Sequence, residues 1–177
     1  MRLKKFIFKK VTSTNNTAIR IIKKTNLNYG MIISDMQKKG KGQYGRKWIS
    51  LKGNLFVSFF FNIENTKFSI KKLTKVICNL IKKTIANFYK KKIIFKPPND
   101  LLIDNKKICG ILQETIFHFN KKFLIIGIGV NVIKNPAIPN YPTTNLYEIT
   151  GKKFTYKLIA KSLKLNFEKE FLKILKM

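Results

Sequence analysis

The segment from Gln37 to Trp48 has the composition of an anion-binding loop. It reads QKKGKGQYGRKW and places three glycines beside Lys41, Arg46 and Lys47, between two apolar runs. Glycines let a backbone approach a ligand closely, and the amides and cations around them suit a phosphate or a carboxylate. An ordinary exposed loop in a lysine-rich chain has a similar composition, so this segment alone leaves both interpretations open.

The spacing of these glycines matches the dinucleotide motif GxGxxG and the start of a P-loop. A P-loop continues with Lys and then Ser or Thr, whereas here Arg46 and Lys47 follow. Both motifs also need a helix directly after the glycines. The next apolar run, residues 54–61, is aromatic and β-branched and predicts a buried strand. We therefore interpret the segment as a glycine-rich basic loop between two strands.

Composition predicts one folded domain over residues 1–177, because a hydrophobic content of 45% with 15 Phe argues against disorder. Cys78 and Cys109 lie in apolar patterns and are expected to be buried free thiols. His118, the single histidine, is expected at a hairpin edge. No stretch reads as a signal peptide or a membrane span, so we expect a cytoplasmic protein that makes no membrane contact.

The formal net charge of +29 is the strongest compositional feature. Of the 37 Lys and Arg residues, only Arg2, Arg20 and Arg46 are arginines, and the lysines run along every segment. This spread favours a general residue bias over a dedicated nucleic-acid surface, although a basic nucleic-acid-binding module remains an alternative. Arg46 stands out, because a guanidinium binds phosphate or carboxylate through two donors at once and lysine does not.

Hydrophobic periodicity predicts an α+β fold: a mixed, largely antiparallel sheet with helices packed mainly on one face. Long amphipathic helices are expected at 69–89 and 156–175, a helix over 18–22, and a short one at 145–150. Strands are expected at 6–11, 30–35, 54–62, 93–95, 100–104, 107–114 and 123–131.

Polar residues and glycines mark the ends of these strands. Residues 13–15 read STN, which suits a helix N-cap or a polar ligand. Asn99 and Asp100 follow two prolines, and Lys107 opens the next strand. Gly127 and Gly129 leave one face of their strand bare, for a flat ligand or for another backbone. This inventory suits orienting and neutralising anions in acyl or phosphoryl chemistry.

In order and spacing, five motifs resemble the catalytic domain of biotin protein ligases. They are STN at 13–15, QxxGKGxxGRKW at 37–48, KxPND at 96–100, KxxGIL at 107–112 and GxGxN at 127–131. The resemblance implies a class II synthetase-like fold. It also implies activation of biotin with ATP to biotinyl-5'-AMP, with Mg²⁺ accompanying the ATP. Biotin then passes to a lysine of a biotin carboxyl carrier protein, as in acetyl-CoA carboxylase.

The resemblance also implies roles for individual residues. Lys107 and Arg46 would be the catalytic cations, and Asp100 would help to position the acceptor lysine or a metal, without a dedicated protein metal site. Biotin would contact Ser13, Thr14, Asn15, Gln37, Gly40, Lys41, Gly42, Gln43, Lys107, Gly110, Gly127 and Gly129. ATP would contact Arg46, Trp48, Asn99, Asp100 and Asn131.

The chain departs from the usual family pattern at three positions. Lys41 and Gln43 stand where arginines are common, and Pro97 replaces a tryptophan. The DNA-binding and small C-terminal domains of some relatives are not recognised, so no specific DNA binding is expected, while a homodimer is possible. Alternatives are a lipoate or octanoate ligase or transferase of the same fold, the nucleic-acid-binding module, and an inactive relative.

Overall fold

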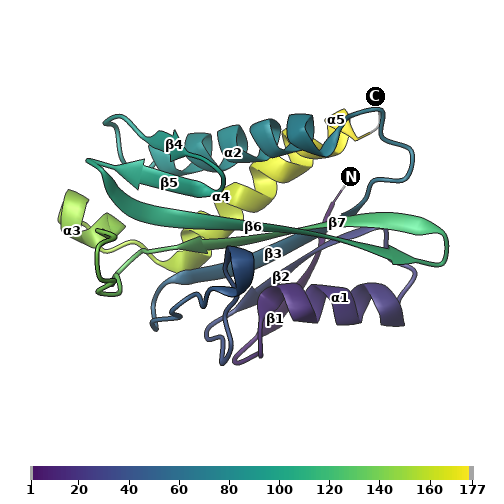
Figure 1. Cartoon of the computed structure of the whole chain (residues 1–177), viewed down its shortest axis with the longest axis horizontal. Coiled ribbons are helices and arrows are strands. Elements are labelled where there is room, and N and C mark those ends of the chain that lie inside the picture. The colour runs from purple at the N-terminus through teal and green to yellow at the C-terminus, as the bar shows by residue number, and fades with distance from the viewer. Residues whose placement is uncertain (1, 176–177) are drawn as a thin grey trace.

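A seven-stranded sheet in the order β1-β2-β3-β7-β6-β5-β4 forms the centre of the molecule (Figure 1). The computed structural model describes residues 2–175. Strand β1 (Lys4–Phe8) pairs in parallel with β2 (Tyr29–Ser34), and every other pairing in the sheet is antiparallel. The remaining strands are β3 (Leu55–Asn62), β4 (Ile94–Lys96), β5 (Asp100–Ile103), β6 (Lys106–His118) and β7 (Lys121–Val130). The predicted mixed, largely antiparallel sheet is confirmed.

Two long helices, α2 (Ile70–Ala86) and α4 (Tyr156–Asn166), cover one face of the sheet (Figure 1). Helix α4 continues through η2 (Phe167–Phe171) into α5 (Leu172–Ile174). Helix α1 (Thr14–Lys24) lies on the opposite face, and the short α3 (Leu146–Thr150) stands at one end of the sheet. Helices thus pack mainly on one face, as predicted. None of them is long and apolar enough to cross a membrane within the part of the chain described.

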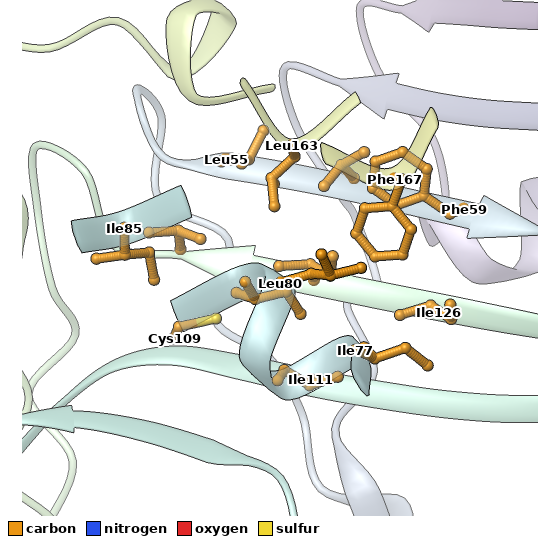
Figure 2. Packing of buried hydrophobic residues seen from close by; sticks show 14 of the residues in the cluster. Leu55, Phe59, Ile77, Leu80, Ile85, Cys109, Ile111, Ile126, Leu163 and Phe167 are labelled. Atoms are coloured by element: carbon orange, nitrogen blue, oxygen red, sulfur yellow. The ribbon is translucent and has the colours of Figure 1, made fainter. Parts of the chain in front are cut away.

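The alternation of side chains along β3 builds a core on each face of the sheet. Leu55, Val57, Phe59 and Phe61 belong to the large cluster under α2 and α4, whereas Phe60 belongs to the smaller one under α1. The Phe59 ring stacks on Phe167 with centroids 4.2 Å apart, and Figure 2 shows this pair beside Leu163. Burial on both faces explains why this strand is apolar almost throughout.

The hairpin of β6 and β7 is longer than the sequence predicted. The expected strand ended at Glu114, whereas β6 runs on to His118, which pairs with Lys121 across the turn. Phe119 and Asn120 form this turn with φ of 45° and 57°. His118 therefore lies at a hairpin edge, as expected. The extension was missed because its residues alternate between exposed and half-buried and carry no continuous apolar signal.

The two thiols are buried and free, as the sequence predicted. Cys78 lies on α2 and Cys109 on β6, both within the large core cluster, where Figure 2 labels Cys109. Burial raises the pKa of the Cys78 thiol to about 11 and raises that of Cys109 further. Both residues therefore act as small apolar packing residues, not as nucleophiles.

The aromatic stack makes a stability prediction. Phe167→Ala should lower the free energy of unfolding by about 3–5 kcal/mol, because it leaves a cavity between η2 and β3. Phe119→Ala is the matched control, since that ring is 80% exposed at the hairpin tip, and it should change stability by less than about 0.5 kcal/mol. Urea unfolding of both variants measures the difference. Equal midpoints would contradict the packing role of Phe167.

Candidate functional site

Helix α1 covers only part of its face of the sheet, and a cavity of about 710 Å³ lies beside it. Its floor is Gly110 of β6 with Gly127 and Gly129 of β7. The start of α1, the loop between β2 and β3, the corner at 96–100 and the loop at 138–141 form its walls. Every site residue predicted from the sequence lines this cavity except Gly40 and Asn131.

The glycine-rich basic loop folds as a tight hairpin. The Gly42 N–H donates to the Arg46 carbonyl at 2.7 Å, and the Trp48 N–H donates to the Gly40 carbonyl at 3.0 Å. Gly45 closes the turn with φ of +74°, a conformation that favours glycine. A Cβ on Gly40 would lie 2.5 Å from the Trp48 carbonyl oxygen. Gly40 therefore permits backbone pairing within the hairpin, outside the cavity lining.

The indole of Trp48 lies on two of the floor glycines. Gly110 and Gly129 face each other across β6 and β7, and a Cβ on either would come within 2.6 Å of the ring. The indole Nε1 is buried and has no hydrogen-bond partner among the described residues. The strip that the sequence left bare thus seats a side chain of the same chain, an occupant that the sequence did not indicate.

Asn15 covers the third floor glycine in the same way. A Cβ on Gly127 would lie 2.4 Å from Asn15 Oδ1. The Asn15 amide donates to Glu114 Oε2 at 2.7 Å, while Ser58 Oγ donates to its Oδ1 at 2.5 Å. Sequence reasoning assigned no role to Ser58 or Glu114. Ser58 is a lone hydroxyl in an apolar strand and carried a usable signal, whereas nothing local marked Glu114.

Gln37 links the start of α1 to the glycine-rich basic loop. Its Oε1 accepts the Thr14 N–H at 2.8 Å, and its Nε2 donates to Ser50 Oγ at 3.1 Å. Ser13 holds the N-cap position of α1, yet its side chain makes no capping hydrogen bond. The polar residues before α1 are therefore arranged toward the cavity, and the simple N-cap interpretation does not account for them.

Lys107, Asp100 and Tyr141 meet at the other end of the cavity. Lys107 Nζ lies 2.8 Å from Asp100 Oδ1, and the Tyr141 hydroxyl donates to Asp100 Oδ2 at 2.5 Å. Burial and the bond to Asp100 raise the pKa of Tyr141 well above its usual value, so its hydroxyl stays protonated. Lys107 Nζ also lies 5.4 Å from the centre of the Trp48 ring. Sequence reasoning missed Tyr141, which sits in an irregular proline-containing loop.

Asn131 is buried outside the cavity lining and holds a loop in place. It is 1% exposed, and its Nδ2 donates to the Thr144 carbonyl at 3.0 Å. In this structure its side chain orders the segment after β7 and does not face the cavity.

Positive charge dominates the cavity. The lining contains one carboxylate, Asp100, against five basic side chains: Lys41, Arg46, Lys47, Lys96 and Lys107. A partly enclosed site with this balance concentrates anions. Within residues 2–175 no three His, Cys, Asp or Glu side chains gather as metal ligands. The donor set therefore offers at most one carboxylate to a metal, which suits an ion carried mainly by substrate phosphates.

The chain matches the model of a known enzyme family. Residues 6–131 match the Biotin/lipoate A/B protein ligase family, and the chain belongs to it. Its structure is similar to that of the biotin protein ligase from Aquifex aeolicus in complex with biotin and ATP. The TM-score is 0.80 at 30% sequence identity, over 98% of this chain and 72% of that one.

Two repressor-type relatives are similar in sequence. The bifunctional ligase/repressor BirA of Bacillus subtilis is 27% identical over 169 residues, which are 91% of this chain and 51% of that protein. BirA of Escherichia coli is 33% identical over 102 residues, which are 56% of this chain and 32% of that protein. The chain therefore spans about half or less of the length of these relatives.

The contact between Trp48 and the floor can be tested by fluorescence, since Trp48 is the only tryptophan. Gly129→Ala should push the indole from its seat, because the added Cβ would lie 2.4 Å from the ring. We expect emission to shift to longer wavelength as the ring meets water. Gly127→Ala, two residues away on the same strand, crowds Asn15 instead and is the matched control. Identical spectra for the two variants would refute this seating.

Proposed function

We propose that this chain is a biotin protein ligase, which joins the carboxylate of biotin to the α-phosphate of ATP and passes the biotinyl group to a lysine. The observation that carries the proposal is the cavity itself. It gathers residues of all five motif segments, two of which supply the glycine floor, with five cations opposed by a single carboxylate.

The reaction must bring two anions together, and the residues present suit that task. Lys107 and Arg46 would neutralise the biotin carboxylate and the α-phosphate, so that a carboxylate oxygen can attack phosphorus and release pyrophosphate. The glycine-rich basic loop would cover the mixed anhydride against water. The acceptor amine would then attack the acyl carbon and AMP would leave. Mg²⁺ would arrive with the ATP, with Asp100 as its one available carboxylate.

The proposed contacts follow the two ends of the cavity. The biotin ring would lie at the α1 end, near Ser13, Thr14, Asn15, Gln37 and Gly127. The carboxylate and phosphates would lie between Lys107 and the glycine-rich basic loop. The nucleotide would extend over Trp48 toward Asn99 and Asp100, with Asn131 acting through the loop it holds. The acceptor would be a biotin carboxyl carrier domain.

A lipoate or octanoate ligase is the second candidate, since the family includes both activities. The α1 end of the cavity favours biotin. Ser13, Thr14, Asn15 and Gln37 surround it with hydroxyl and amide groups, which match the polar ureido ring of biotin. The sulfur ring of a lipoyl group and the alkyl tail of an octanoyl group would not form hydrogen bonds with these hydroxyl and amide groups. A nucleic-acid-binding module would rest on net charge alone.

A reconstituted transfer assay tests the proposal. The protein is incubated with biotin, ATP, Mg²⁺ and a purified carrier domain, and biotinylated carrier and pyrophosphate are measured. We expect both products, and neither when ATP is omitted. Lipoate and octanoate in place of biotin are the specificity controls. No biotinylated carrier together with no pyrophosphate release would rule out the ligase function, and preferential lipoyl transfer would establish the second candidate.

Removal of single cations should distinguish the effect of the cavity cations from that of the many surface lysines. Lys107→Ala and Arg46→Ala should each lower the rate of biotinyl-5'-AMP formation by about 10²–10³-fold, the usual cost of losing a positioned electrostatic group. Lys157→Ala, an exposed lysine on α4, is the control and should leave the rate unchanged. Circular dichroism checks that all three variants fold. Equal rates in all three would refute the assigned roles.

A further inference from the structure

Tyr141 and Lys107 are the two side chains that contact the Asp100 carboxylate within residues 2–175. The Tyr141 hydroxyl donates to Asp100 Oδ2 at 2.5 Å. Lys107 Nζ lies 2.8 Å from Asp100 Oδ1. Tyr141 thus holds one oxygen of Asp100, and the other pairs with Lys107.

The backbone holds Tyr141 next to this ion pair. The Lys107 N–H donates to the Pro142 carbonyl at 2.8 Å, and the Thr144 N–H donates back to the Lys107 carbonyl at 2.9 Å. Asn145 Nδ2 donates to Asn135 Oδ1 at 2.5 Å across the base of the same loop. The segment that carries Tyr141 is therefore tied to the strand that carries Lys107, and the hydroxyl needs no ligand to reach Asp100.

Two lysines of the cavity lie near the Tyr141 ring. Lys96 Nζ is 4.5 Å and Lys107 Nζ 5.5 Å from its centre. These contacts use the ring face, whereas the bond to Asp100 uses the hydroxyl. Tyr141→Phe therefore removes one function and keeps the other.

During the proposed reaction, the buried carboxylate of Asp100 would lose the positive charge that Lys107 supplies. It is only 8% exposed, and Lys107 is its one ion-pair partner in the described chain. Any substrate anion that Lys107 binds competes with Asp100 for that charge. A buried carboxylate that loses its countercharge and has no hydrogen-bond donor is strongly destabilised. Something must stabilise Asp100 when Lys107 turns to the substrate.

We propose that Tyr141 is a positioning residue that holds Asp100 through its hydroxyl and so releases Lys107 to bind substrate carboxylate and phosphate. The inference rests on the proposed function and adds a residue to it. Tyr141 touches no reacting atom in this scheme. Without its hydroxyl, Asp100 would hold Lys107 more tightly, and anions would bind less well.

Anion binding gives a direct test without turnover. Inorganic pyrophosphate and ATP are titrated while Trp48 emission is followed, since Lys107 lies beside that ring. Tyr141→Phe should weaken both affinities about tenfold or more, the usual effect of losing a hydrogen bond to a charged group. In the transfer assay the KM for ATP should rise by a similar factor, with a much smaller change in kcat.

Two further variants make the test specific. Tyr156→Phe removes an equally short Tyr–Asp bond, 2.5 Å from its hydroxyl to Asp35 Oδ1, outside the cavity lining. It should leave both affinities unchanged. In an Asp100→Asn background, Tyr141→Phe should have no further effect, because the residue acts through Asp100.

The outcomes separate the inference from the ligase function. A wild-type chain that binds pyrophosphate but transfers no biotin argues against the function and leaves the Tyr141 measurement valid. Affinities of Tyr141→Phe within twofold of wild type overturn the inference. So does an equal loss in the Asp100→Asn background, and so does a wild-type chain with no saturable response to pyrophosphate.

Discussion

The candidate site depends on one constraint, the absence of side chains at three neighbouring positions of the sheet. Strand β7 sends Leu124, Ile126, Ile128 and Val130 into the large core under α2 and α4. Its other face carries Gly127 and Gly129, and Gly110 of β6 lies beside Gly129. One strand thus builds the core with one set of alternate residues and the cavity floor with the other. A larger residue at any of these glycines would collide with Asn15 or Trp48.

The positions of the few acidic residues determine where positive charge is neutralised in this chain. Each of the eight acidic side chains has a hydrogen-bond or ion-pair partner in the described structure; they are Asp35, Glu64, Asp100, Asp104, Glu114, Glu148, Glu168 and Glu170. Only Asp100 lies in the cavity lining. With lysine on almost every segment, the site is distinguished less by its positive charge than by its geometry. Five cations and one carboxylate line the same cavity.

The sequence predicted the sheet and most of the cavity because both are recorded locally. Continuous apolar runs mark strands covered on two faces, as in β3, and glycines at alternate positions mark a bare face. The contacts that complete the site join segments far apart in the chain, as Tyr141 with Asp100 and Asn15 with Glu114 do. No hydrophobic period or residue spacing indicates such pairs, so only the three-dimensional structure identifies them. Asn131 is the opposite case. Its place in a sequence motif was clear, but its buried side chain donates a hydrogen bond to the loop at Thr144.

Trp48 covers part of the glycine floor of the cavity. Trp48 lies over Gly110 and Gly129 and Asn15 lies over Gly127, so the indole forms most of the surface above the floor. Its Nε1 is a buried donor without a partner among the described residues, an arrangement that costs about 1–3 kcal/mol in general. A ligand acceptor at that nitrogen would recover this energy. The glycines therefore set the depth at which Trp48 lies, and Trp48, with Lys107 beside it, sets the plane of the surface that faces the cavity. The hairpin that begins at Gly40 fixes that plane, because Trp48 is hydrogen-bonded to its base.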